Sequence, residues 1–208
     1  MTKVKICGMM GPEDLEVAKG ADYLGFVVMS DSFRSLPVPK AKSLISSCSG
    51  KRVVVTSSSD TRTIIWLAEM LEPDAVQVHS LLSAPELGFL AEECPCDVWG
   101  LVPIGQGEGM QRALSVCDVL DAMVLDTHDE RLGGSGKKHD WEVSRTIREA
   151  LPSSPVVLAG GLSPSNAAEA IRSVRPYAVD VSSGVEKGRR KDPELIDQFI
   201  RNAREAIP

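Results

Sequence analysis

Short apolar stretches rich in Val, Ile and Leu recur along the whole chain, and helical patterns separate them. They span residues 4–7, 23–28, 52–56, 75–79, 98–104, 122–127, 156–159 and 178–182. Each stretch is apolar at successive positions, which is typical of parallel strands that are covered on both faces. Their starts lie roughly 25 residues apart, which is the length of one strand, one helix and the loops between them.

Helix start signals fall between these stretches. Pro12 with acidic residues after it predicts one helix start, and Ser83-Ala84-Pro85-Glu86 forms a capping box with a proline inside it. Ser163-Pro164 predicts a helix over residues 165–174, and Asp192-Pro193 opens the last helix. The chain therefore alternates strand and helix from one end to the other.

Eight strand–helix units predict an α/β protein, a single-domain (β/α)8 TIM barrel over residues 1–208. A doubly wound open sheet produces the same alternation and stays open as the alternative, although the count of eight units favours the barrel. No Gly/Ser-rich or charged linker divides the chain, so one domain is expected.

Composition limits the classes of function. Hydrophobic residues make up 43% of the chain and charged residues 25%, which is the balance of a soluble globular protein. The net charge of −6 and the aromatic content of 4% argue against a nucleic-acid partner. Apolar runs stay far below the roughly 18 residues of a membrane-spanning helix, so no membrane partner is expected. The five scattered cysteines predict free thiols in a reducing cytoplasm.

The predicted barrel has its chemistry at the C-terminal ends of its strands. Those ends carry titratable or glycine-rich residues from distant parts of the chain, namely Cys7, Arg34, His79, Asp126, Gly160-Gly161 and Ser183-Gly184. Lys, Pro and Asp turn residues dominate the opposite ends. This asymmetry predicts an active site at one mouth of the barrel.

Cys7 and Asp126 are the candidate acid–base pair. A thiol acts as a general base when its pKa is lowered, and a carboxylic acid in a partly apolar pocket donates a proton when its pKa is raised. Together they could take a proton from carbon while protonating an oxygen. Each also has a plainer interpretation, since cysteine is often simply buried and aspartate often caps a turn. Arg34 could hold a carboxylate through its planar fork or could be a solvated loop cation.

The glycine pairs at the last two strand ends predict a phosphate site. Gly160-Gly161 precedes a helix start and Ser183-Gly184 ends the last strand, so backbone amides there can face an anion. Ordinary turn glycines are the alternative. Another glycine segment, residues 133–136, lies in a long loop that is either a lid or a surface excursion. It matches neither a nucleotide P-loop nor a dinucleotide fingerprint, so no ATP or NAD cofactor is expected.

The remaining polar residues predict no metal site. The three histidines, His79, His128 and His139, lack the paired spacing of metal ligands. His79 could assist at the active site or be an ordinary strand-end histidine. The basic run over residues 187–191 is expected to be a solvated loop that adds positive potential near the phosphate.

Six motifs follow one another in a fixed order. They are Val4-Lys5-Ile6-Cys7-Gly8-Met9, Gln77-Val78-His79, Leu125-Asp126-Thr127, Gly133-Gly134-Ser135-Gly136 with Asp140-Trp141, Leu158-Ala159-Gly160-Gly161-Leu162-Ser163-Pro164 and Val179-Asp180-Val181-Ser182-Ser183-Gly184-Val185-Glu186. In this order, and over essentially the whole chain, they resemble the signature segments of the phosphoribosylanthranilate isomerase family. The first and the last motif are specific when they occur together.

The resemblance implies a (β/α)8 barrel of tryptophan biosynthesis that catalyses an Amadori rearrangement without a cofactor. The implied substrate is N-(5-phospho-β-D-ribosyl)anthranilate, and the product is 1-(2-carboxyphenylamino)-1-deoxy-D-ribulose 5-phosphate. By position, Asp126 matches the family's general acid, which protonates the furanose ring oxygen. Cys7 matches its general base, which takes the proton from C2 of the sugar.

The binding positions carry over in the same way. Arg34 matches the arginine that holds the anthranilate carboxylate, and His79 and Asp180 match positions that line the anthranilate end. The positions that match the phosphate cradle are Gly160, Gly161, Ser183 and Gly184. The implied partner is a small phosphorylated substrate, and the assembly is either a monomer or a homodimer.

The chain departs from the family pattern in places. Ser32-Phe33-Arg34 stands where Ser-Pro-Arg is common, and the stretches at 52–56 and 98–104 match poorly. Two other functions stay open, namely another phosphosugar barrel enzyme and a non-catalytic ligand-binding descendant. The first would use two aspartates, at strands one and six, so Cys7 argues against it. The presence of both Cys7 and Asp126 argues against the second.

Overall fold

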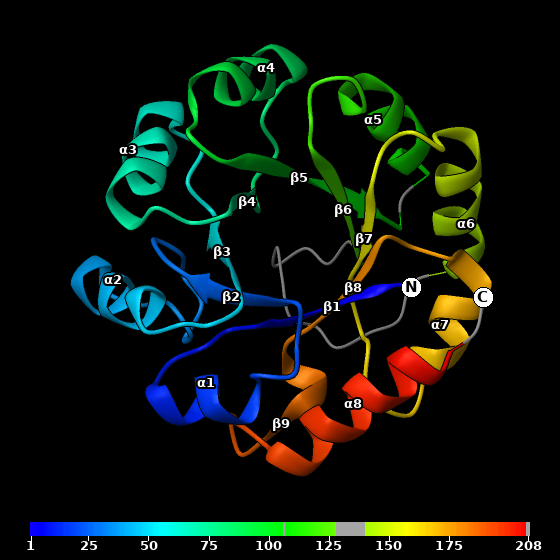
Figure 1. Ribbon diagram of the computed structural model, residues 1–208. Helices are drawn as coiled ribbons and strands as arrows, with labels where there is room; N and C mark the ends of the chain where they lie inside the picture. Colours follow the sequence, from blue (N-terminus) through cyan, green and yellow to red (C-terminus); the bar gives the residue numbers. More distant parts are fainter. Residues whose placement is uncertain (106, 128–139, 207–208) are drawn as a thin grey trace.

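The computed structural model describes residues 1–105, 107–127 and 140–206. Eight parallel strands close into a barrel in sequence order, and helices surround it (Figure 1). The strands are β1 (Lys3–Cys7), β2 (Tyr23–Val27), β3 (Lys51–Thr56), β4 (Ala75–Val78), β5 (Asp97–Ile104), β6 (Ala122–Thr127), β7 (Val156–Leu158) and β8 (Ala178–Val181). Because β8 pairs with β1, the predicted barrel is confirmed and the open sheet is wrong.

The helices of the described ranges lie between the strands and after the last one. They are α1 (Pro12–Val17), α2 (Val38–Ser46), α3 (Thr61–Leu71), α4 (Ala84–Glu93), α5 (Gly109–Val116), α6 (Trp141–Ala150), α7 (Ala167–Val174) and α8 (Pro193–Glu205). The expected capping box is present, since the Ser83 amide donates to the Glu86 carboxylate at 2.7 Å. In the same ranges, no helix combines the length and the apolar character needed to cross a membrane.

One helix begins later than its sequence suggests. The pattern predicts a helix from residue 165, but α7 begins at Ala167. The preceding residues form a turn in which the Asn166 side chain accepts from the Ser163 amide at 2.8 Å and donates to the Gly161 carbonyl at 2.9 Å. These side-chain hydrogen bonds favour the turn over another helical turn, and they tie the start of α7 to the end of β7.

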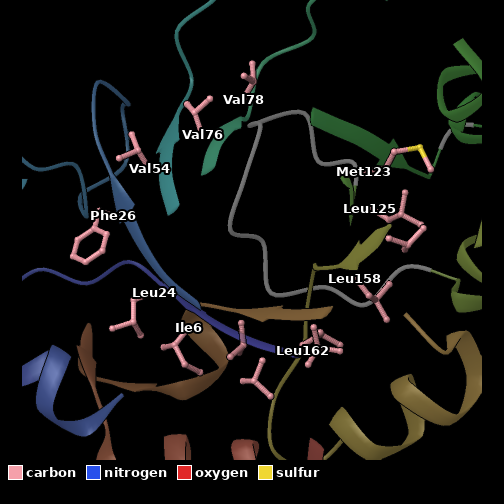
Figure 2. Close-up of a cluster of buried hydrophobic side chains, with 14 of the residues drawn as sticks. Ile6, Leu24, Phe26, Val54, Val76, Val78, Met123, Leu125, Leu158 and Leu162 are labelled. Atoms are coloured by element: carbon pink, nitrogen blue, oxygen red, sulfur yellow. The ribbon is translucent and has the colours of Figure 1, made fainter. Parts of the chain in front are cut away.

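The core has two layers, because successive strand residues point to opposite faces of the barrel wall. The outer layer lies between strands and helices, and Figure 2 shows part of it, including Ile6, Phe26 and Leu158. The inner layer fills the barrel itself with mostly small side chains and two large aromatic ones, Tyr23 and Trp99, whose ring centroids are 5.1 Å apart. This filled interior leaves the C-terminal mouth as the place for a ligand.

Aspartates at the opposite mouth fix the register of three strand pairs. Asp22, Asp74 and Asp121 stand directly before β2, β4 and β6, and we call each of them a strand clamp. Each clamp donates its amide to the carbonyl of a residue near the start of the preceding strand and accepts that residue's amide on its carboxylate. The clamped residues are Val4, Arg52 and Val98, and these hydrogen bonds are 2.7–3.0 Å long.

Candidate active site

A cavity of about 680 Å³ opens at the C-terminal ends of the strands. That volume lies within the roughly 300–1,000 Å³ that is usual for small-molecule sites. The predicted site residues that line it are Cys7, Arg34, His79, Asp126, Gly160, Gly161, Asp180 and Ser183. The structure thus brings together residues from six of the eight strand ends. The glycine segment 133–136, predicted to be a lid or a surface excursion, lies outside the described residues.

Cys7 is the last residue of β1, and it is 8% exposed. Gly25 of the neighbouring strand makes room for it, because a Cβ there would lie 2.8 Å from the Cys7 sulfur. Burial raises the pKa of the Cys7 thiol, while the positive charge of Lys5 and a hydrogen bond from it act in the opposite direction. The pKa stays raised overall, so Lys5 offsets part of the effect of burial and favours the reactive thiolate.

Lys5 is a functional candidate that the sequence interpretation missed. Its ammonium is fully buried and lies 2.7 Å from Asp180 Oδ2. Burial by itself lowers the pKa of Lys5, but the charges of Asp180 and Cys7 and their hydrogen bonds outweigh it, so the pKa is raised. The available signal was a lysine two residues before Cys7 on an apolar strand, since such residues share one face.

Asp126 lies at the end of β6 opposite His79. Its Oδ1 accepts the Thr127 amide at 2.7 Å, and its Oδ2 is 3.9 Å from His79 Nε2. Burial raises the pKa of Asp126, and the charge of His79 opposes that rise. Gly160 has a φ of +80° and leaves space for this carboxylate, because a Cβ there would lie 2.7 Å from Asp126 Oδ1. A carboxyl group in this setting can hold a proton and donate it.

Arg34 is not a solvated loop cation. Its side chain is 13% exposed, and its Nε and Nη2 donate to the two carboxylate oxygens of Glu186 at 2.8 and 2.7 Å. Gly8, with a φ of +86°, leaves room for the Arg34 side chain, because a Cβ at that position would lie 2.5 Å from Arg34 Cδ. Glu186 occupies one edge of the guanidinium, and the edge formed by Nη1 and Nη2 can take a second carboxylate.

The proposed phosphate cradle divides into two parts. Gly160, Gly161 and Ser183 line the cavity, and both glycines have positive φ, at +80° and +64°. Gly184 lies behind this rim, because a Cβ there would collide with the Leu162 carbonyl. The absence of a side chain at Gly184 therefore lets the loop after β8 pack tightly against the loop after β7.

Three buried polar atoms beside the cavity lack a hydrogen-bond partner among the described residues. They are Gln77 Oε1, His79 Nδ1 and Asp180 Oδ1, and all three residues line the cavity. Buried polar atoms are costly when unpaired, so these atoms are suited to hydrogen-bond a ligand. In the ranges that the structure describes, His, Cys, Asp and Glu form no cluster of three that could hold a metal.

The expectation of a solvated basic loop at residues 187–191 is wrong for its last member. Lys191 belongs to a short strand, and its side chain is only 2% exposed. It lies 2.7 Å from Glu186 Oε1, the same oxygen that Arg34 Nε binds. Glu186 holds the cavity residue Arg34 and Lys191 holds Glu186, and the sequence interpretation singled out neither of them. No motif near Glu186 or Lys191 in the sequence indicates that they form a network with Arg34.

Comparison with known proteins supplies the identity of the family. The family model described as "N-(5'phosphoribosyl)anthranilate (PRA) isomerase" matches residues 4–202. An N-(5'-phosphoribosyl)anthranilate isomerase of Methanothrix thermoacetophila is 41% identical over 98% of this chain and 99% of its own length. Monomers of the dimeric phosphoribosylanthranilate isomerase of Thermotoga maritima superpose with a TM-score of 0.87, at 34% identity, over 98% of this chain and 99% of theirs.

A second solved structure adds a ligand to the comparison. It is a phosphoribosylanthranilate isomerase in complex with reduced 1-(o-carboxyphenylamino)-1-deoxyribulose 5-phosphate. It superposes with a TM-score of 0.84, at 32% identity, over 98% of this chain and 99% of that one. Because the family model and these relatives match nearly the whole chain, the protein belongs to the N-(5'-phosphoribosyl)anthranilate isomerase family.

Proposed function

We propose that this cavity converts N-(5'-phosphoribosyl)anthranilate to 1-(2-carboxyphenylamino)-1-deoxy-D-ribulose 5-phosphate, a step in the biosynthesis of L-tryptophan. The main support is that a thiol with a nearby ammonium and a carboxyl group with a raised pKa line one cavity. An Amadori rearrangement needs a base at a carbon and an acid at an oxygen. A relative in complex with the reduced form of this product supports the same substrate class.

Asp126 acts first in the proposed mechanism. Because burial raises its pKa, the carboxyl group can hold a proton and donate it to the furanose ring oxygen. The C1–O bond then breaks, and the nitrogen lone pair forms a Schiff base at C1. The positive charge on this Schiff base makes the proton on C2 acidic.

Cys7 then removes the C2 proton as a thiolate. The electron pair of the C–H bond forms the C1–C2 double bond of an enolamine, which tautomerises to the ketone. Lys5 favours the thiolate through its positive charge, against the effect of burial. The sugar gains one proton for each that it loses, so the proposed rearrangement needs no cofactor.

The binding groups are assigned by charge and position. Arg34 would hold the anthranilate carboxylate, with His79 and Asp180 at the same end of the substrate. The phosphate would bind at Gly160, Gly161 and Ser183, with Gly184 packed behind them. Since the whole chain carries a net charge of −6, attraction for an anionic substrate has to come from such local groups.

The experiment that tests this function follows the fluorescence of phosphoribosylanthranilate as the purified protein consumes it. Cys7→Ser and Asp126→Asn should each remove most of the turnover, with unchanged circular dichroism, because neither replacement can exchange a proton as the native group does. Cys117→Ser is the matched control, since Cys117 is a free thiol outside the cavity. Full turnover in either site variant would refute the role given to that residue.

Location and assembly complete the proposal. Five free cysteines support a reducing compartment, and we place the enzyme in the cytoplasm. The assembly is a monomer or a homodimer, and the dimeric relative from Thermotoga maritima supports the homodimer. Light scattering on the purified protein distinguishes the two states.

A further inference from the structure

A short hairpin follows β8 and contacts Arg34, a residue that lines the cavity. It consists of β9 (Glu186–Lys187) and β10 (Arg190–Lys191), which pair antiparallel after the 3-10 turn η1 (Ser183–Val185). Lys191 faces inward from this hairpin, whereas Lys187 is 60% exposed and pairs with Asp192 at the surface. The two lysines of one hairpin thus have different environments.

Lys191 is the centre of a buried polar network. Its ammonium donates to Glu186 Oε1 at 2.7 Å and to the Ser182 carbonyl at 3.0 Å. Glu186 in turn accepts two hydrogen bonds from Arg34, and Ser182 Oγ donates to the Cys7 carbonyl at 3.1 Å. The hairpin is therefore connected both to the arginine and to the backbone of β1.

The charges of this network do not cancel. The side chains of Arg34, Glu186 and Lys191 are 13%, 8% and 2% exposed, so solvent screens their charges poorly. Arg34 and Glu186 alone form a neutral pair. With Lys191 the trio carries one net positive charge, which a ligand carboxylate at the open edge of Arg34 would neutralise.

The guanidinium of Arg34 is also held from its flat side. The Phe33 ring centroid lies 4.2 Å from Arg34 Cζ, and Arg189 of the hairpin lies 4.9 Å from the same ring. Glu186 fixes one edge and Phe33 covers one face, so the arginine is oriented before a ligand arrives. Such preorganisation lowers the entropic cost of binding.

We propose that Lys191 is a positioning residue for carboxylate recognition, which holds Glu186 on one edge of Arg34 and supplies the net positive charge that the substrate carboxylate neutralises. This inference rests on the proposed function, because it concerns how the protein binds the carboxylate of that substrate. Lys191 itself acts through Glu186 and Arg34.

The test compares two ligands that differ only in the carboxylate. The first is reduced 1-(o-carboxyphenylamino)-1-deoxyribulose 5-phosphate, and the second is its phenylamino counterpart without the carboxylate. Calorimetry gives the Kd of each for the native protein, for Lys191→Met and for Lys187→Met. The last variant removes the same charge from the exposed face of the same hairpin.

We expect Lys191→Met to weaken binding of the carboxylated ligand about tenfold or more, which corresponds to about 1.4 kcal/mol. Binding of the ligand without the carboxylate should not change, and Lys187→Met should leave both ligands unaffected. Lys191→Arg should recover part of the loss. If Lys191→Met does not fold, Lys191→Gln keeps a hydrogen-bond donor without the charge, and the same selective loss is expected.

Two results would overturn the inference. Equal weakening of both ligands would show that Lys191 only supports the fold, and unchanged binding of both would show that it plays no part. Failure of the proposed function looks different, because the native protein would then bind neither ligand.

Discussion

Replacing Lys5 with methionine should destabilise the protein, because the buried carboxylate of Asp180 then loses its partner. The ammonium of Lys5 lies 2.7 Å from Asp180 Oδ2, with side-chain exposures of 0% and 8%. At an effective dielectric constant of about 20, charges at that separation attract by roughly 6 kcal/mol. Methionine keeps most of the volume but leaves Asp180 buried and alone, and losing one partner of such a pair costs about 3–5 kcal/mol.

Urea unfolding measures this loss as a deficit in unfolding free energy. The double variant Lys5→Met with Asp180→Asn should recover most of the stability, since it removes both buried charges. Iodoacetamide should also alkylate Cys7 more slowly in the single variant, because its thiolate loses the ammonium.

Two outcomes would refute this reasoning. A deficit that is the same in the double variant would mean that the loss comes from packing and not from the unpaired charge. An unchanged rate of alkylation would remove Lys5 from the account of how Cys7 is activated.

Three further predictions concern single side chains. Asp126→Asn should stabilise the fold at pH 8 but not near pH 3 in thermal melts, because burial raises the pKa of Asp126 in the folded protein, and the resulting cost grows as the pH rises above the ordinary value of a carboxyl group. Gly160→Ala should lower the melting temperature well beyond Gly188→Ala, since both have positive φ but only the first Cβ meets Asp126 and Thr127. Asp74→Ala should lose about 1 kcal/mol near pH 7. Burial alone raises the pKa of Asp74, but hydrogen bonds from Arg52 hold it below its ordinary value, so this loss should shrink as urea titrations move to acid pH.

The barrel and the position of Cys7 and Asp126 in one cavity could be predicted because both follow from local patterns. Eight apolar stretches indicated eight strands, and parallel strands place all their C-terminal ends at one mouth. Cys7 and Asp126 lie at the C-terminal ends of such strands. Their position in one cavity could therefore be predicted without knowing how distant side chains pack.

The charged network could not be predicted because it depends on which way side chains point. The strand with Lys5 is apolar on both faces, so periodicity does not say whether the lysine points into the barrel. Lys191 lies in a run of basic residues that is typical of a solvated loop, and only the pairing of β9 with β10 turns it inward. Arg34 meets Glu186 across 152 positions of sequence, a contact that depends on closure of the barrel.

The strand clamps have a consequence for how the chain can be rearranged. They join β1 to β2, β3 to β4 and β5 to β6, whereas in the described part of the chain β7 and β8 are joined at this end by the backbone hydrogen bond from Tyr177 to Val156, without a clamp. New termini placed between β2 and β3 or between β4 and β5 would separate no clamp from its partner. Circular permutants opened at those connections should therefore refold more readily than permutants opened inside a clamped pair, which makes the two-strand unit the natural module of this barrel.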